Sequence, residues 1–225
     1  PVVSEAIELI RLDSSGYARI DWSGAVLIAD IARVGPDYLP AHAHADSLSF
    51  EFALDGTRVF VNSGTSVYST GTERQRQRGT AAHNTVVVDG QDSSEVWAGF
   101  RIARRAYPEI GTISTAGSEV TLGCSHTGYL RLPGKVRHMR KWVCKKSQLE
   151  IEDCLDGKFT TAVGYLLLHP TWQFATYSER SVLLRHFDGR EIIVEVEGGK
   201  FRAEAATWHP RFGASISTAR LVTDF

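Results

Sequence analysis

Short apolar runs separated by turn dipeptides constrain the fold of this 225-residue chain more than any other feature of its sequence. The runs have the length of β-strands, and none keeps a helical period over three turns. Turns are marked by Asp55-Gly56, Asp89-Gly90, Pro133-Gly134, Asp156-Gly157, Asp188-Gly189 and Gly198-Gly199. Many strands with short connections predict an all-β fold, a large two-layered antiparallel β-sandwich.

The expected strands are spread over almost the whole chain. In the first half they cover residues 17–20, 25–31, 48–54, 59–62, 84–88 and 101–107. In the second half they cover residues 119–125, 136–143, 149–153, 163–168, 172–175, 181–185, 192–197 and 201–205. Only residues 4–11 and 71–79 could carry a short helix. Without a repeat or linker, residues 1–225 are expected to form one domain. A start without methionine suggests a fragment of a longer chain.

Composition excludes several classes of protein. A hydrophobic share of 43% with 23% charged residues suits a buried core rather than disorder. The formal charge of −1 gives no reason to expect nucleic acid or a membrane surface as a partner, so an anionic ligand needs a local basic patch. No apolar run reaches the ~20 residues of a membrane span. Three cysteines without Cys-x-x-Cys spacing exclude a disulfide framework and a cysteine zinc cluster.

Side chains that carry chemistry concentrate between residues 42 and 84. An extended segment would place His42, His44 and Asp46 on one face, because residues two apart on a strand point the same way. A His-x-His pair can offer two imidazoles to one metal ion, and His83 is the candidate for a third ligand. Asn62 is a further candidate, although a neutral amide is a poor zinc ligand and the residue also suits a turn.

The hairpin around Asp55-Gly56 decides on which side Asn62 lies. A two-residue loop would gather the apolar side chains on one face and turn Asn62 away from the histidines. A three-residue loop starting at Leu54 would place Asn62 on the histidine side. Both registers stay open, and a bulge near Asp46 would reconcile them.

A basic loop lies just before His83. Arg74, Arg76 and Arg78 occupy alternate positions and could hold carboxylates or sulfates of an acidic polymer through forked hydrogen bonds. The alternative is a solvated loop with one arginine packed inward. Tyr68 is a candidate for a catalytic or sugar-contacting role, with packing as the alternative. The nearby aromatic residues Trp97 and Phe100 are expected to pack in the core.

Several of these segments together resemble the heparinase II/III-like polysaccharide lyases. The resemblance rests on the run from Gly35 to Glu51 that contains His-Ala-His-Ala-Asp, on Val-Asn-Ser-Gly-Thr at 61–65 with Tyr68, and on Arg-Gly-Thr-Ala-Ala-His-Asn-Thr-Val at 78–86. Gly-Tyr-Leu-Arg-Leu-Pro-Gly at 128–134 and Leu-His-Pro at 168–170 fit the same pattern. The match covers most of the chain from Gly16 to about Pro170.

The resemblance implies the C-terminal β-sandwich domain of an enzyme whose N-terminal part is an (α/α) toroid, with the substrate cleft between the two. Such lyases cleave uronic-acid polysaccharides by β-elimination, with the toroid supplying a tyrosine acid/base and a residue that neutralises the carboxylate. The implied partners are an anionic polysaccharide and the toroid domain. The expected location is the periplasm or outside the cell.

The resemblance also assigns roles to individual residues. His42 matches a cleft histidine implicated in proton transfer, and Tyr68 matches a tyrosine that lines the cleft. His44 and His83 match the histidines that hold a structural zinc ion. Asn62 stands where other members have an aspartate ligand, and Asp46 or water could compensate for the missing carboxylate. Substrate binding is expected from the remaining motif residues, Arg74, Arg76, Arg78 and Asn84.

Two alternatives belong to other functional classes. One is a non-catalytic glycan-binding or exopolysaccharide-assembly domain on the same scaffold, which the substituted metal position favours. The other is a cupin-like metal enzyme that uses His42, His44 and His83. Glycan binding without turnover would indicate the first alternative, and a stoichiometric redox-active iron would indicate the second.

Overall fold

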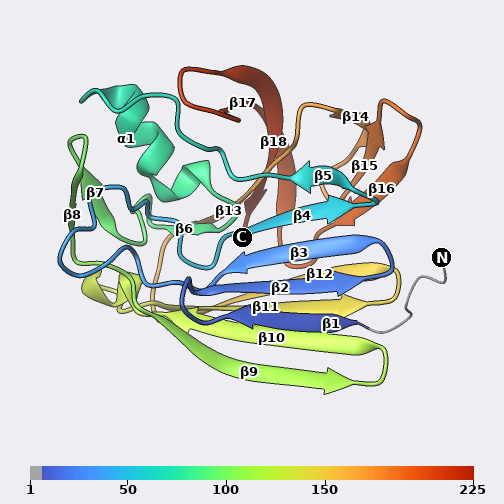
Figure 1. Ribbon diagram of the computed structural model, residues 1–225, viewed down its shortest axis with the longest axis horizontal. Coiled ribbons are helices and arrows are strands. Elements are labelled where there is room, and N and C mark those ends of the chain that lie inside the picture. Colours follow the sequence, from blue (N-terminus) through green and yellow to red (C-terminus); the bar gives the residue numbers. More distant parts are fainter. Residues whose placement is uncertain (1–6) are drawn as a thin grey trace.

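The computed structural model describes residues 7–225, and these residues are built almost entirely of antiparallel strands (Figure 1). The largest sheet has the order β1-β2-β3-β4-β5. Its strands are β1 (Glu8–Leu12), β2 (Tyr17–Trp22), β3 (Ala25–Asp30), β4 (Phe50–Leu54) and β5 (Thr57–Phe60). A second sheet, of order β12-β11-β10-β9, contains β9 (Pro108–Ala116), β10 (Glu119–His126), β11 (Arg137–Lys145) and β12 (Gln148–Asp156). Strand β2 packs against β11, which places these two sheets face to face.

The remaining strands form three smaller sheets. A four-stranded sheet has the order β17-β18-β13-β6 and contains β6 (Val86–Val88), β13 (Ala162–Leu167), β17 (Lys200–Trp208) and β18 (Ile216–Asp224). A three-stranded sheet contains β14 (Trp172–Tyr177), β15 (Ser181–His186) and β16 (Glu191–Glu195). A hairpin is formed by β7 (Glu95–Trp97) and β8 (Arg101–Ala103), and beside it lies the helix α1 (Thr72–Arg78) (Figure 1). Two 3₁₀ turns are η1 (Thr80–Ala82) and η2 (Gly128–Arg131).

A single large core connects four of these sheets. In β2 the buried residues alternate with exposed ones, as expected of a strand with one face on the core. Ile20 of β2, Trp142 of β11, Leu184 of β15 and Leu221 of β18 are all fully buried in the same cluster. The predicted all-β antiparallel sandwich is therefore confirmed. Among residues 7–225, no helix has the length and hydrophobicity that a membrane span requires.

Several expected elements differ from the structure. The helix expected over residues 71–79 is confirmed as α1. The helix expected over residues 4–11 is wrong from Glu8 onward, because Glu8–Leu12 pairs with β2, while residues 4–6 lie outside the described residues. The strand β9 was not expected because nearly all its residues are exposed, so it lacks apolar alternation. It forms because β10 supplies a pairing edge.

The hairpin of β4 and β5 has the two-residue loop, one of the two registers that the sequence left open, followed by a bulge. Leu54 pairs with Thr57, so the loop has the two residues Asp55-Gly56. A bulge then shifts the register, and Phe52 pairs with Phe60. Because one residue is inserted, the side chains beyond the bulge change faces, and Asn62 reaches the histidine side. The bulge lies within the hairpin rather than near Asp46.

Candidate functional site

The segment that carries the two closely spaced histidines is a loop rather than a strand. Residues 41–49 have no strand pairing, so the expectation that His42, His44 and Asp46 share one face is wrong. His42 is exposed, whereas the side chains of His44 and Asp46 are at least half-buried. The loop lacks a partner strand because its backbone groups bond to α1 and η1 instead. Ala45 N–H donates to Arg78 O at 2.8 Å, and Thr80 Oγ1 donates to Ala45 O at 2.8 Å.

The helix α1 buries a polar face. Arg74, Gln77 and Arg78 are buried and lie three and four residues apart, which puts them on one side of the helix. Arg78 donates from Nε and Nη2 to Ala43 O, at 3.1 and 3.0 Å, and from Nη1 to Trp97 O. The side chain is fully buried and its Nε, Nη1 and Nη2 all donate to backbone carbonyls, so Arg78 fixes the loop beside His42 and is not exposed to a polymer, as in the alternative of an inward-packed arginine.

The other expected substrate-binding residues occupy different positions. Asn84 is also buried: its Nδ2 donates to Phe50 O and Val61 O, and its Oδ1 accepts from Leu167 N–H at 2.7 Å. Asn84 therefore joins β4, β5 and β13 and is not available to a polymer. Arg76 is exposed but pairs with Glu73 at 2.6 Å. Of the expected set, only Arg76 offers its guanidinium to solvent.

Three aromatic rings and one guanidinium lie around His42. We name this group the His42 cluster: His42, Tyr68, Phe100, Phe212 and Arg74. The ring of His42 meets Tyr68 and Phe100 edge-on, with centroids 5.4 and 5.7 Å apart. Phe212 stacks on Tyr68 at 5.0 Å. The Arg74 guanidinium lies 5.1 Å from the centre of the Tyr68 ring, a distance typical of a cation–π contact. Tyr68, Phe100 and Phe212 all keep substantial exposure, so the cluster forms an open aromatic surface.

Phe100 and Phe212 are members of this cluster that sequence reasoning missed. Phe100 was expected in the core, yet it is 44% exposed. Its position depends on the β7–β8 hairpin, which brings it against His42. Phe212 follows β17, far away in the sequence, and no pattern in the chain links it to Tyr68. A long-range contact of this kind has no local sequence signal.

A possible metal site lies beside the His42 cluster. One ligand atom each from His44, Asp46 and His83 lie within 4.8 Å of one another. The rings of His44 and His83 are 5.3 Å apart. Two imidazoles and a carboxylate are a donor set that zinc accepts. The structure thus joins the expected ligands His44 and His83 with Asp46, the residue expected to compensate for a missing carboxylate.

Asn62 fixes the orientation of the His83 ring through a hydrogen bond to its Nδ1. Asn62 Oδ1 accepts from Gly64 N–H at 3.2 Å, which fixes which end of the amide is oxygen. The same oxygen lies 3.1 Å from His83 Nδ1, so Nδ1 carries the proton and donates it. His83 Nε2 then has a bare lone pair, and it is buried without a hydrogen-bond partner among the described residues. A ligand histidine usually donates its other N–H in this way.

The local backbone makes this arrangement possible. Gly64 has φ +73, and a Cβ there would lie 2.1 Å from His209 O. Only glycine allows the chain to pass His209 this closely. The N–H of Gly64 donates to Asn62 Oδ1 two residues earlier, the pattern of an Asx turn.

Burial keeps both histidines of the possible metal site neutral. Burial, and secondly the neighbouring His83, lower the pKa of His44 to about 3. Burial also lowers the pKa of His83 to about 3. Burial raises the pKa of Asp46, which His44 partly offsets. Arg74 Nη1 lies 3.4 Å from His44 Nε2, so that nitrogen accepts a hydrogen bond in the structure described. Neutral imidazoles are the form that binds metal ions.

The comparison with known proteins agrees with the architecture. A family model described as heparinase II/III-like, C-terminal, matches residues 6–225. The chain belongs to this family. A mutant heparan sulfate lyase of Pedobacter heparinus superposes with TM-score 0.76 at 18% identity, over 96% of this chain and 34% of that one. A heparinase III structure superposes with TM-score 0.75 at 17% identity, over 98% of this chain and 34% of that one.

These comparisons establish family and fold. The predicted resemblance to heparinase II/III-like lyases is confirmed. The chain spans about a third of the length of the matched lyase structures. No functionally curated protein matches the sequence.

Proposed function

We propose that this chain is the β-sandwich part of a polysaccharide lyase that cleaves a uronate-containing, anionic glycan by β-elimination. The observation that carries the proposal is the His42 cluster. An exposed imidazole lies edge-on to an exposed phenol, on an aromatic surface that can take the apolar face of a sugar ring. Family membership supports the same chemistry, because matched structures are described as heparinase III and as heparan sulfate lyase.

In β-elimination a base removes the proton on C5 of the uronate, the C5 electron pair forms the double bond to C4, and the glycosidic oxygen leaves C4 with the pair of the broken bond and takes up a proton from an acid. His42 has only ring contacts among the described residues, so its nitrogens are open to exchange a proton with a bound sugar. Tyr68 positions the sugar ring beside it. Arg78 holds Ala43 O and so fixes the backbone next to His42.

We propose a structural zinc ion for the second part of the site. His44, Asp46 and His83 would hold it, and Asn62 would orient His83 through the Nδ1 hydrogen bond. The bare, buried Nε2 of His83 supports this assignment. The ion would crosslink the His44 loop to the segment after η1 and so stabilise the loop that carries His42.

The remaining groups that β-elimination requires are assigned to an (α/α) toroid domain. Within residues 7–225, the His42 cluster has no exposed, unpaired cation. Its one arginine, Arg74, is buried and donates to Gly99 O. Neutralisation of the uronate carboxylate is therefore placed on the toroid. We also assign the protein to the periplasm or the cell exterior, where acidic polysaccharides are processed.

The test uses the full-length natural protein that contains this chain. Wild type is incubated with a panel of uronate polymers, including heparan sulfate, and the ultraviolet absorbance of the new conjugated double bond is followed. We expect at least one polymer to yield unsaturated products, identified by mass spectrometry. The proposal fails if every polymer stays intact or if the products are saturated.

The non-catalytic glycan-binding alternative is favoured by one observation. Three of the expected substrate-binding residues are fully buried and cannot bind a polymer directly: Arg74, Arg78 and Asn84. Glycan binding by the full-length protein that is unaffected by His42→Ala, without any unsaturated product, would identify this alternative. Redox-active iron bound at His44 and His83 would instead indicate a cupin-like enzyme.

A further inference from the structure

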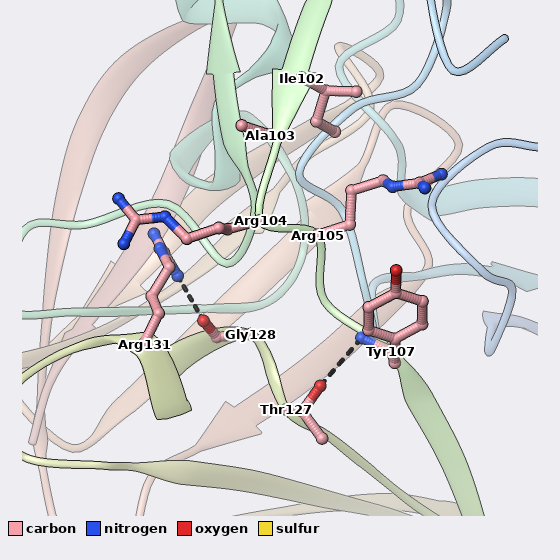
Figure 2. A pocket seen from close by; sticks show the side chains of 8 residues that line it. All are labelled: Ile102, Ala103, Arg104, Arg105, Tyr107, Thr127, Gly128 and Arg131. Atoms are coloured by element: carbon pink, nitrogen blue, oxygen red, sulfur yellow. Dashed lines mark hydrogen bonds between the residues drawn. The ribbon is translucent and has the colours of Figure 1, made fainter. Parts of the chain in front are cut away.

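A pocket lies where β8 runs into residues 104–107 and meets the start of η2 (Figure 2). It has a volume of about 450 Å³. Its lining is made of Ile102, Ala103, Arg104, Arg105, Tyr107, Thr127, Gly128 and Arg131. None of these residues belongs to the His42 cluster or to the possible metal site. Three arginines line it with a tyrosine and a threonine.

The charge around this pocket is positive on balance. Arg104 and Arg131 share Glu95, whose carboxylate Arg104 Nε reaches at 2.8 Å, and Arg105 pairs with Asp37 at 2.8 Å. Arg33 also lies close, 5.9 Å from the centre of the Tyr107 ring and 3.7 Å from Asp37. Four cations therefore face three carboxylates, because Arg131 also acts on the carboxylate of Asp92. The chain as a whole has a formal charge of −1, so this is a local concentration of positive charge.

The individual arginines have different roles. The side chain of Arg131 is 10% exposed, and its donors reach Gly128 O, Ser93 O and Asp92 O. It thus contributes charge and rigidity. The side chain of Arg104 is 68% exposed, and within residues 7–225 its hydrogen bonds and ion pairs all go to Glu95, so its guanidinium can turn to an incoming anion.

The rest of the pocket suits a sugar ring. Figure 2 shows Tyr107 and Thr127 joined by a hydrogen bond from Tyr107 N–H to Thr127 Oγ1, which leaves the hydroxyl hydrogen of Thr127 free to donate. The ring of Tyr107 is 43% exposed and offers an apolar face. The floor is rigid because η2 packs on Ser93: a Cβ at Gly128 would lie 2.2 Å from Ser93 O. Aromatic face, hydroxyl and guanidinium are the groups that bind an acidic sugar.

The pocket is linked to the His42 cluster by two short stretches of chain. Phe100 contacts His42, and Ile102 and Arg104 follow within roughly 13 Å of extended chain. Arg105 Nη1 also donates to Val34 O and Pro36 O, in the loop that leads to His42. The two places are therefore close enough for one glycan chain to touch both.

We propose that this pocket is a secondary subsite that binds one acidic sugar unit, carboxylated or sulfated, a few units away from the residue at His42. The proposal rests on the proposed lyase function and adds to it a dependence on chain length. Long oligosaccharides gain the contact with Arg104 and Tyr107, and short ones that reach only the His42 cluster do not.

The test measures Kd by calorimetry for size-defined acidic oligosaccharides, from disaccharide to octasaccharide, with the full-length protein. Arg104→Gln is expected to weaken binding of the octasaccharide roughly tenfold and to leave the disaccharide unchanged. Tyr107→Ala, a second variant, should show the same length dependence. Arg101→Gln is the matched control, since Arg101 is an exposed arginine of the same hairpin that lies over Trp97, outside the pocket.

The outcomes separate this proposal from the one on which it rests. If Arg101→Gln and Arg104→Gln weaken binding equally, the effect is general electrostatics and the subsite is refuted. If neither Arg104→Gln nor Tyr107→Ala changes the octasaccharide Kd while wild type still produces unsaturated products, only the subsite is refuted. If wild type binds no oligosaccharide of any length, the proposed function and the subsite fail together.

Discussion

At the scale of single residues, the pair Asn62 and His83 decides what the buried site can bind. An aspartate at position 62 would bring a negative charge, whereas the amide brings a fixed acceptor. That acceptor keeps the proton of His83 on Nδ1 and leaves Nε2 bare. In this chain the anionic contribution therefore comes from Asp46, and Asn62 sets the tautomer of His83.

A pair of substitutions at position 62 tests this account. Asn62→Ala removes the acceptor for His83 Nδ1–H and is expected to weaken zinc binding about 10- to 100-fold. Asn62→Asp keeps an acceptor, adds charge and should bind zinc at least as tightly as wild type. Competition with a chromophoric chelator measures both affinities. Unchanged zinc affinity in Asn62→Ala would show that the residue has no part in the site.

The residue scale also shows the limits of sequence reasoning. The proximity of His44 and His83 could be expected from the motif, and so could a role for Asp46. The sequence could not predict that Arg74 and Arg78 point inward. Their direction depends on which face of a seven-residue helix meets the loops at Ala43 and Gly99. The helical spacing by itself separates Arg76 from the other two, because residues two apart on a helix do not face the same way.

At the scale of secondary structure elements, α1 stabilises the loop that carries His42. A helix that faces a core normally buries an apolar stripe. Here the buried stripe consists of arginine and glutamine, whose donors satisfy carbonyl groups of loops without regular structure. Gln77 extends this role by donating to Ser66 Oγ at 2.8 Å. The helix replaces the partner strand that residues 41–49 lack.

Two arginine substitutions on α1 should therefore differ sharply. Arg78→Lys keeps the charge but cannot reach Ala43 O with two parallel donors, and a loss of about 2–4 kcal/mol in the free energy of unfolding is expected. Arg76→Lys, on the exposed side of the same helix, should change stability by less than about 0.5 kcal/mol. Urea denaturation measures both. Equal effects would contradict the assignment of Arg78 as the structural arginine.

At the scale of the whole molecule, a buried polar network joins β11 and β12 to the segments that precede β4 and β6. Arg140 of β11 donates to both oxygens of Asp153, each at 2.8 Å, and also to Leu48 O and Asn84 O. His138 Nε2 lies 2.6 Å from Asp153 Oδ1. Leu48 precedes β4 and has a positive φ of 61. The network thus holds a strained residue close to the possible metal site.

The acid sensitivity of folding should depend on this network. Burial raises the pKa of Asp153, but Arg140 and His138 outweigh that effect and hold it well below its usual value. The folded state therefore binds this proton less readily than the unfolded state, so the stabilisation exists at neutral pH and is lost as the pH falls below about 4. Asp153→Asn should cost about 3–5 kcal/mol at neutral pH and flatten the acid dependence.

Denaturant unfolding from about pH 6 to about pH 3 checks this prediction. The matched control is Glu152→Gln, which breaks the exposed pair with Lys141 on the same two strands and should leave stability nearly unchanged. An Asp153→Asn variant with wild-type stability and an unaltered acid dependence would contradict the role of the network.

The architecture of the whole molecule was only partly predictable. Period-two alternation and glycine turns predicted an antiparallel sandwich because these signals are local. The sheet order β17-β18-β13-β6 was not predictable, since it pairs strands far apart in the chain, such as β6 and β13 at Val86 and Gly164, that carry no pairing signal. The contact of Phe212 with Tyr68 is of the same kind.

The central claim is that His42 takes part in proton transfer during β-elimination, and the kinetics of His42→Ala test it most directly. With a polymer that wild type cleaves, the initial rate of unsaturated-product formation is measured for the full-length wild type and variant, and oligosaccharide Kd is measured alongside. We predict a kcat about 10²- to 10⁴-fold lower with little change in Kd or in unfolding temperature. A variant that forms unsaturated product at the wild-type rate would contradict the claim.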